Sequence, residues 1–474
     1  MRDRWCVYRY DVRRLAAEWP PEIAGKPPVL EDVKDGRWFL LRPDGFPDRT
    51  VNGFLASARM RTLALSTNRD YAYSLALWLS FLDSRGVDWA SATEEDVEEF
   101  EFWRLTDPRN ESPVGTSTFG KDVAACKKFY RWAADRIPDV SDVFSDVAPP
   151  PSKRSARVRW LDPAAVSRWR DLGLRGRGKD GRPSLSGGTR NEQRDVAFYE
   201  GLYGTGLRLS EWSSIIVDEI PPLDSRRSFF KAVLADRCAK GGYGHPYWIP
   251  RRTLADVESY VEGPRALAIE KARRRGLYEA LSNAVVVGAS KMRHCIALPA
   301  EGGGFVDRSV NLTDPSLRLR LYRRTSHGLE PLALWLNEDG MPRAAHAWHH
   351  TFSAANDRIA HLGLSNFSCT PHMLRHSFAL RWFSIGKLVY SSRLTHLSGS
   401  EARDFRSQFG DTWHLVQTML GHRRVETTKN VYLEPFRSLD VEVLLAHAEG
   451  QYPSDLFSEL FEHHPLVATD PLRT

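Results

Sequence analysis

The chain has 474 residues, of which 42% are apolar and 27% are charged, as expected of a soluble globular protein long enough for two or three domains. No apolar run reaches membrane-spanning length, and the first residues lack a secretory apolar core, so we expect a cytoplasmic protein without a membrane partner. The five cysteines occur singly, without a C-x-x-C pair, which argues against a disulfide framework and a thiolate zinc site.

The net charge of +6 is unevenly distributed. Residues 151–190 hold 11 Lys and Arg against 3 Asp and Glu, a local balance of +8 that exceeds the excess of the whole chain. A basic stretch of this kind is typical of polyanion binding, although a solvated loop has the same composition.

The first part of the chain predicts a helical domain behind a short extension. Residues 1–56 mix aromatic and Pro/Gly-rich pieces and are expected to form an N-terminal arm. Apolar periodicity predicts helices in residues 66–86, 94–105 and 119–137, with Thr93 as a helix start. These helices would form a domain over residues 57–147, the third one burying Phe119, Val123, Cys126, Tyr130 and Ala133.

A proline-rich, basic segment separates this domain from a larger one. Pro149 to Pro151 and the basic residues after them predict a linker over residues 148–160. Asp162 and Pro163 form a good N-cap and first helical position for a second domain, residues 161–450, followed by a tail, residues 451–474.

The second domain is expected to be mostly helical, with one hairpin. Apolar runs in "SFFKAVLA" and "YWIP" predict two strands, and Gly241 and Gly242 predict the turn between them, with Lys240 at its mouth. The expected fold class is therefore mainly α with a small antiparallel β-sheet. The basic residues expected to contact nucleic acid are Lys121, Lys127, Lys128, Arg131, Lys153, Arg154, Arg157, Arg159, Arg175, Arg177 and Lys179.

The stretch "TPHMLRHSFALRW" places His372, Arg375 and His376 at i, i+3 and i+4, so on a helix they share one face. Taken alone, this pattern fits a metal site, an anion site or an ordinary helix start. His346 and His350 also have a spacing that can hold zinc, but no H-E-x-x-H pattern accompanies them, so no metal is expected.

Four stretches carry a more specific pattern. "GTGLRLSE" contains Arg208 and "CAKGGYGHPYWIP" contains Lys240; "TPHMLRHSFALRW" and "LGHRRVETTKNVYLEP" follow, the last with His422 and Tyr432. Each motif alone is weak. Their order resembles that of the tyrosine recombinase (phage integrase) family, whose active site has Arg, Lys, His-x-x-Arg, His and a nucleophilic Tyr. The resemblance spans roughly Ser57 to Phe436 and implies a helical core-binding domain followed by a catalytic domain.

The resemblance also implies the chemistry. Tyr432 would attack a DNA phosphate and form a 3′-phosphotyrosine, which conserves the bond energy without a cofactor or a metal. Arg208 and Arg375 would bind the non-bridging oxygens, and Lys240 would protonate the departing 5′-oxygen. His372 would accept the tyrosine proton.

Three further roles follow from the same resemblance. His422 would donate a hydrogen bond to the phosphate. Glu211 would orient Arg208, although a solvated helix carboxylate is an open alternative. His376 is expected to be a packed or second-shell residue.

The implied function is site-specific DNA recombination, in integration, excision or transposition of a mobile element. The expected partners are double-stranded DNA gripped by both domains, three further copies that complete a homo-tetramer on DNA, and possible helper proteins; the free protein would be a nucleoid-associated monomer. The alternatives are a non-catalytic DNA-binding or architectural protein of the same fold, a type IB topoisomerase and a metal nuclease. Segments at about 254–345 and 384–411 are longer than the family pattern, and the motifs favour a transposon-borne or actinobacterial-type integrase.

Overall fold

The computed structural model describes residues 4–10, 36–148, 160–183, 189–290, 292, 294–300, 302–394, 412–422, 425, 428 and 466–472, with the backbone alone for 387–394. The chain divides into two compact units, Met1–Ser155 and Ala156–Thr474. Among the described helices, none is long and apolar enough to cross a membrane.

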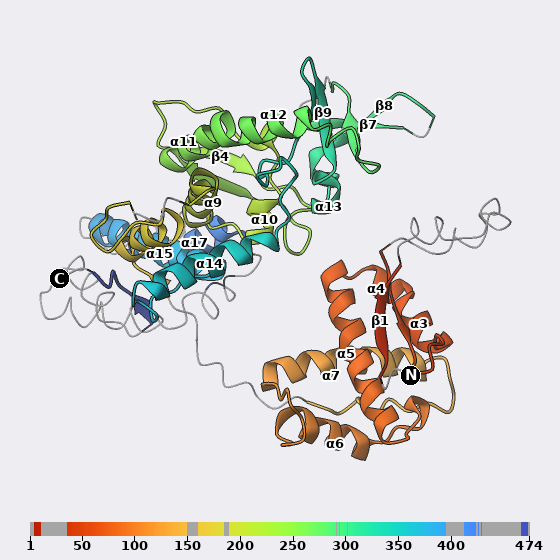
Figure 1. Ribbon diagram of the computed structural model, residues 1–474. Coiled ribbons are helices and arrows are strands. Elements are labelled where there is room, and N and C mark those ends of the chain that lie inside the picture. The colour runs from red at the N-terminus through yellow and green to blue at the C-terminus, as the bar shows by residue number, and fades with distance from the viewer. Residues whose placement is uncertain are drawn as a thin grey trace, which may run out of the picture. The chain divides into compact units, whose positions relative to one another are not determined.

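The first unit is built mainly from helices (Figure 1). Its elements are β1 (Cys6–Arg9), β2 (Trp38–Leu41), α3 (Arg49–Leu55), α4 (Ala58–Arg61), α5 (Leu65–Ser84), a short 3-10 turn (Trp89–Ser91), α6 (Glu94–Leu105) and α7 (Thr116–Ala134). Buried aromatic side chains join α5 to α6 and α7: the Trp78 ring packs edge-on against Phe100 at 5.0 Å, and its indole N–H donates to the Tyr130 hydroxyl at 3.1 Å. A single aromatic core therefore holds the three helices together.

The three helices predicted in this unit are confirmed. The side chain and backbone of Thr93 and Asp96 form a capping box at the start of α6, with a Thr93 N to Asp96 Oδ2 distance of 2.9 Å. In α7 all of the residues that were predicted to be buried are buried: Phe119, Val123, Cys126, Tyr130 and Ala133.

The N-terminal residues, expected to form an arm, instead share the core of this unit. Trp5, Leu40 and Phe54 are buried in the same apolar cluster as α5 and α7. The Asn52 side chain bonds to the backbone N–H and C=O of Leu40, at 2.8 and 2.9 Å, and so fixes β2 against α3. The apolar side chains of these residues are therefore part of the core of the first unit.

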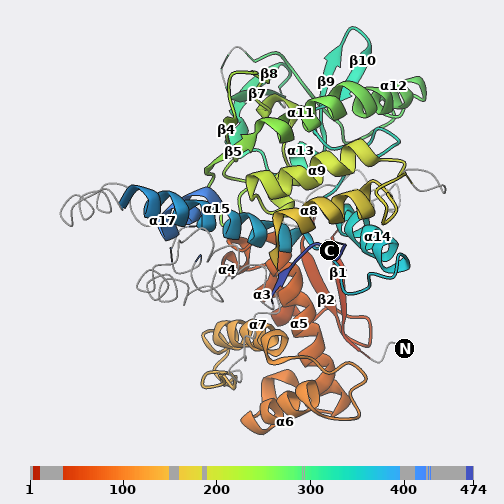
Figure 2. The same ribbon diagram turned by 90° about the vertical axis from the view of Figure 1, so that its left-hand side faces the viewer.

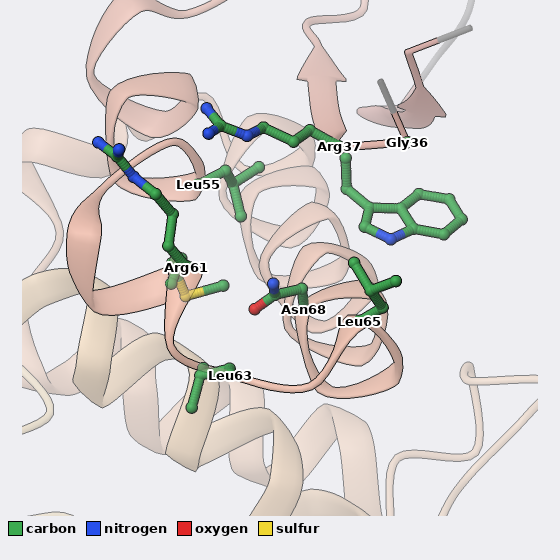
Figure 3. Close-up of a pocket in the computed structure, with 9 residues that line it drawn as sticks. Gly36, Arg37, Leu55, Arg61, Leu63, Leu65 and Asn68 are labelled. Atoms are coloured by element: carbon green, nitrogen blue, oxygen red, sulfur yellow. The ribbon is translucent and has the colours of Figure 1, made fainter. Parts of the chain in front are cut away.

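A pocket of about 250 Å³ opens between β2 and the start of α5 (Figure 3). Leu63 and Leu65 contribute apolar lining, and the long side chains of Arg37 and Arg61 extend to the same side of it. Two arginines and several apolar side chains thus line the same pocket of the first unit.

In the second unit, helices and short strands pack around helix α9 (Figure 2). Its elements are β3 (Trp160–Leu161), α8 (Pro163–Trp169), a π-helical turn (Arg170–Leu174), α9 (Glu192–Thr205), α10 (Leu209–Ser213), a 3-10 turn (Val217–Glu219), β4 (Phe229–Val233), β5 (Pro246–Pro250), α11 (Arg251–Tyr260), a π-helical turn (Val261–Arg265), α12 (Ala266–Arg274), β6 (Val285–Val287), β7 (Cys295–Pro299), β8 (Phe305–Ser309), a 3-10 turn (Val310–Leu312), α13 (Pro315–Arg318), β9 (Leu321–Thr325), β10 (Gly328–Pro331), α14 (Ala347–His361), α15 (Pro371–Leu394), α17 (Thr412–Leu420) and β11 (Val467–Ala468). The predicted N-cap is confirmed, since Asp162 Oδ1 accepts from Ala165 N at 2.6 Å.

The core of the second unit forms where α9 meets α14. Phe198 of α9 stacks on Trp348 of α14 with ring centroids 3.5 Å apart, and Trp335 packs edge-on against both rings. Helix α15 packs on α9 and lies beside α17 (Figures 1 and 2). These contacts bring segments that are far apart in sequence to one side of α9.

The fold class is confirmed as mainly helical with small sheets, but the sheets differ from the prediction. The predicted hairpin is present, because β4 pairs antiparallel with β5. The segment after α12, expected to be mostly helical, instead forms β6 to β10, a three-stranded sheet ordered β10-β9-β6 and a β7–β8 hairpin. Two of the pairings, β6 with β9 and β3 with β11, are parallel. These strands are five residues or shorter, too short for a period of two to stand out.

Candidate active site

The end of α9 and the start of α10 position the first arginine. Gly206 ends α9 with a left-handed φ of +69°, a conformation that is energetically unfavourable for a residue with a Cβ atom. The chain then turns, and Arg208 occupies the N-cap of α10. Its backbone N–H donates to Glu211 Oε2 and its guanidinium Nη1 donates to Oε1, both at 2.8 Å. The "GTGLRLSE" motif therefore folds into an arginine held by the acid three residues later.

Glu211 connects three parts of the site. It is 0% exposed, and besides Arg208 it accepts from the backbone N–H of Lys240 at 3.2 Å and lies 3.9 Å from Arg375 Nη1. Burial acts to raise the pKa of Glu211, but the guanidinium groups of Arg208 and Arg375 outweigh it and hold that pKa below its ordinary value. The solvated-carboxylate interpretation is therefore wrong, and the carboxylate is ionised between the two arginines.

Lys240 lies in the connection between β4 and β5, as the sequence predicts. Gly241 and Gly242, with φ of +92° and +76°, make the turn that follows it. The backbone of Lys240 is fixed by Glu211 while its side chain is exposed. A cation on a fixed backbone can reach a ligand that enters from solvent.

Arg375 on α15 is the buried partner of Arg208. It is 1% exposed, its Nη1 donates to the carbonyl of Gly206, and its Nη2 donates to the carbonyl of Leu420 at 2.8 Å. Nη2 also lies 3.1 Å from Nε2 of His422. Helices α9, α15 and α17 are thus joined at one guanidinium group.

The contacts of His422 determine its tautomer. A guanidinium can only donate, so Nε2 of His422 accepts from Arg375, and Nδ1 must carry the proton and donate to Thr428 Oγ1 at 2.9 Å. Burial, followed by the charges of Arg375 and Arg208, lowers the pKa of His422 to about 3. His422 is therefore a neutral imidazole at physiological pH.

His372 and His376 are hydrogen-bonded to each other. Their Nε2 atoms lie 2.9 Å apart, so one of the two carries the shared proton. His376 is fully buried and packs edge-on against Trp160 with ring centroids 5.7 Å apart, whereas His372 is exposed. Burial and the nearby cation Arg375 lower the pKa of His372. His372 can accept a proton from a ligand, and His376 fixes its ring.

Tyr432 lies outside the described residues, as do the basic residues Lys153, Arg154, Arg157 and Arg159. The structure thus brings together Arg208, Glu211, Lys240, His372, Arg375, His376 and His422 from the predicted set. The position of the predicted nucleophile stays a prediction.

The other predicted DNA contacts differ in their surroundings. On α7, Lys121 and Arg131 are exposed and Lys127 and Lys128 are half-buried. In the second unit Arg177 is half-buried and Lys179 is exposed. Arg175 lies 3.3 Å from the carboxylate of Asp171 and 3.5 Å from that of Glu192, so its charge is already neutralised within the unit.

The histidine-rich region does not form a metal centre in the part of the chain that the structure describes. No group of three or more His, Cys, Asp or Glu side chains there could hold a metal ion. His346 and His350 are both exposed at the start of α14.

Sequence reasoning missed two residues of the site, Thr428 and His245. Thr428 is buried against His422, and His245 is placed at the end of the hairpin connection, next to Gly421. A Cβ atom at Gly421 would lie 2.1 Å from Cδ2 of His245, so the two residues are in direct contact. The only sequence signal was the position of His245 in the "CAKGGYGHPYWIP" motif.

Comparison with known proteins agrees with the family indicated by the motifs. Residues 51–136 match the phage integrase N-terminal SAM-like domain, which confirms the resemblance to the tyrosine recombinase (phage integrase) family. No curated protein sequence matches the chain.

Several solved structures are similar to this chain. The XerH site-specific recombinase bound to palindromic difH substrate, in a post-cleavage complex, is 13% identical over 82% of this chain and 82% of that chain, with a TM-score of 0.47. The Tn1549 transposon integrase in complex with circular intermediate DNA is 14% identical over 81% of this chain and 94% of that chain, with a TM-score of 0.42. The XerA recombinase is 14% identical over 88% of this chain and 99% of that chain, with a TM-score of 0.29.

Proposed function

We propose that this protein is a site-specific DNA recombinase that cleaves and rejoins DNA through a 3′-phosphotyrosine intermediate. One observation carries the proposal: Arg208 and Arg375, from separate helices, flank the buried carboxylate of Glu211, at 2.8 and 3.9 Å. Two fixed guanidinium groups at one point are suited to a phosphate whose negative charge increases in the transition state.

The proposed reaction assigns roles to Tyr432, His372, Lys240 and the two arginines. The Tyr432 oxygen attacks the phosphorus, its proton passes to His372, and the bond from phosphorus to the 5′-oxygen breaks. Lys240 gives a proton to that departing oxygen, and the reverse sequence, with a 5′-hydroxyl from a second DNA strand, rejoins the backbone. The charge is neutralised by the two arginines, so the proposal requires no divalent cation.

The proposed partners follow from the reaction. Exchange of strands between two DNA sites needs four copies of the chain, so we propose a tetramer assembled on DNA. Phosphate contacts from exposed cations such as Lys121, Arg131 and Lys179 would supply much of the affinity, which should fall with rising salt.

A covalent-trapping experiment tests the proposal. The full chain is incubated in EDTA with a pool of nicked duplexes of randomised sequence, and DNA linked to protein is recovered after denaturation. The proposal expects an adduct with the wild type and with Tyr73→Phe, an exposed tyrosine of the first unit, and none with Tyr432→Phe.

The other outcomes separate the alternatives. No adduct from any duplex would favour a non-catalytic DNA-binding protein. Cleavage that requires Mg²⁺ or Zn²⁺ would favour a metal nuclease. Relaxation of supercoiled DNA of arbitrary sequence, without joined products, would favour a type IB topoisomerase.

A further inference from the structure

His245 lies inside the proposed phosphate site, although no motif assigns it a role. It is the last residue before β5, and its carbonyl accepts from Leu234 N at 3.0 Å, which closes the β4–β5 connection. The preceding residue is also fixed, since Gly244 N donates to Asp236 Oδ1 at 2.7 Å. The backbone that presents the His245 ring is therefore well determined.

The ring of His245 packs directly on the turn that carries His422. Gly421 has a left-handed φ of +62°, and any Cβ atom there would overlap Cδ2 and Nε2 of His245, at 2.1 and 2.3 Å. The glycine of the "LGH" motif is thus needed both for its backbone conformation and for the space that this ring occupies.

Both ring nitrogens of His245 are buried, and neither has a hydrogen-bond partner among the described residues. Its charged neighbours are Glu211, Arg375 and Arg208. Burial is the main reason that its pKa is lowered, so the ring is neutral and has one N–H donor and one acceptor. Buried polar groups are nearly always bonded, so an unbonded imidazole beside two guanidinium groups calls for an explanation, and a ligand of the site is one.

Three charged or titratable groups of the site, Arg375, His422 and Arg208, differ in this respect. Arg375 donates to two backbone carbonyls, and His422 is bonded on both ring nitrogens. Arg208 bonds to Glu211 through Nη1 and is 25% exposed. A phosphate oxygen that enters beside Arg208 and Arg375 would therefore meet the ring of His245, a neutral donor without a partner in the described chain.

We propose that His245 is a further phosphate-contacting residue of this site, and that its imidazole N–H donates a hydrogen bond to a non-bridging oxygen of the DNA phosphate. This inference rests on the proposed function, because the phosphate it contacts is the one that the reaction cleaves. The bond strengthens as charge accumulates on that oxygen, so His245 contributes more to the rate of cleavage than to DNA binding.

Two substitutions separate hydrogen bonding from packing. His245→Leu keeps an apolar side chain against Gly421 but removes the donor, whereas His245→Gln keeps a donor. In the adduct assay we expect His245→Leu to slow adduct formation about 100-fold and His245→Gln to restore most of the rate, while both bind duplex DNA like the wild type. His327→Ala, an exposed histidine in the turn between β9 and β10, is the matched control.

A second measurement does not depend on cleavage. Orthovanadate, a phosphate analogue, is added to the full chain while the ring carbon and proton signals of the histidines are followed by NMR, with His245 assigned through His245→Gln. The proposal expects the His245 signals to shift and those of His327 to stay.

The outcomes are distinct. A wild-type rate for a folded His245→Leu, or vanadate that shifts His422 and leaves His245 unchanged, overturns the inference. If the wild type forms no adduct but vanadate still shifts His245, the proposed function fails while the phosphate contact stands.

Discussion

The two arginines of the site are held by different means. Arg375 is fully buried, and backbone carbonyls of Gly206 and Leu420 fix its guanidinium. Arg208 is partly exposed, and a side chain, Glu211, fixes it at 2.8 Å. A side-chain substitution does not remove the two carbonyl groups that hold Arg375, but it can remove the carboxylate that holds Arg208. Glu211 is therefore the residue through which the arrangement can be tested.

We predict that Glu211→Gln slows adduct formation about 100-fold while DNA affinity changes little. The neutral amide cannot pair with Arg208 as the carboxylate does, and a guanidinium displaced by about 1 Å no longer matches the transition state. Rates of adduct formation and dissociation constants for the same duplex check this. Glu270→Gln, at an exposed helical ion pair, is the control, and equal losses in rate and affinity would contradict the prediction.

Acid should destabilise the second unit through its buried histidines. The pKa of His422 is lowered from 6.5 to about 3, so between these values the unfolded chain binds a proton that the folded chain does not. The free energy of unfolding then falls as the pH falls, by up to about 1.4 kcal/mol per pH unit for this group. The lowered pKa values of His372 and His245 act in the same direction.

Unfolding by urea at about pH 5 and about pH 6.5 measures this effect. We expect His422→Gln to reduce the loss of stability between the two pH values, and His327→Gln to leave it as in the wild type. Because the pKa of Glu211 is lowered from an ordinary value of 4.5, this carboxylate contributes little between pH 5 and pH 6.5. An unchanged pH dependence in His422→Gln would show that His422 is not protonated on unfolding.

At the scale of elements, one glycine joins two helices to the site. Gly206 ends α9 at a φ of +69°, gives its carbonyl to Arg375, and leaves no room for a Cβ atom, which would lie 2.4 Å from the Phe378 ring. Gly276, after α12, has a similar φ of +63° but open space around it.

We predict that Gly276→Ala lowers the free energy of unfolding by about 1 kcal/mol, the cost of left-handed backbone for a residue with a Cβ atom. Gly206→Ala should cost about 1–3 kcal/mol more, because the Phe378 ring must move. Thermal and urea unfolding of the two variants, measured side by side, separate the cost of the backbone conformation from the cost of displacing the Phe378 ring. If the two variants lost the same free energy of unfolding, the displacement of the Phe378 ring would contribute nothing to the effect of Gly206→Ala.

A buried arginine connects the inserted sheet region to the site. Arg318 of α13 forms two bonds to Glu219, at 2.7 and 2.9 Å, and donates to the carbonyl of Ser214, the residue that ends α10. By contrast, Arg323 on β9 forms an ion pair with Asp218 in which both side chains are nearly half exposed to solvent.

We predict that Arg318→Met destabilises the second unit by about 3–5 kcal/mol, because it removes the cation that pairs with Glu219, whose side chain is only 12% exposed. Arg323→Met should cost less than about 1 kcal/mol, since an exposed ion pair contributes little. Unfolding by urea with a fluorescence readout compares the two. A small effect of Arg318→Met would mean that water replaces the lost bonds.

Whether an element could be predicted depended on local signals. The capping box joins Thr93 to Asp96 and the N-cap bond joins Asp162 to Ala165, each pair three residues apart in sequence, so sequence was sufficient for both. The strands β6 to β10 are short and their pairing is partly parallel, which depends on contacts far apart along the chain. In the site, chain order was enough for Arg208 and Arg375, whereas His245 became visible only through its contact with Gly421.

At the scale of the whole molecule, the boundary between Ser155 and Ala156 separates a unit without the proposed catalytic residues from one that contains all of those described. Each unit has its own apolar core, so each can be tested as a fragment. The first unit also shows where its fragment must begin, because residues before Ser57 supply part of its core.

We predict that residues 1–155 fold alone and bind duplex DNA weakly and without sequence preference, with an affinity that falls with salt. A fragment that begins at residue 57 should not fold, because it lacks Trp5, Leu40, Val51 and Phe54, all buried in this core. Each of them contributes about 1.5–3 kcal/mol, and together they equal the whole stability of a typical domain, about 5–15 kcal/mol. Circular dichroism melting of both fragments checks this, and a cooperative transition in the shorter one would show that the core is complete without them.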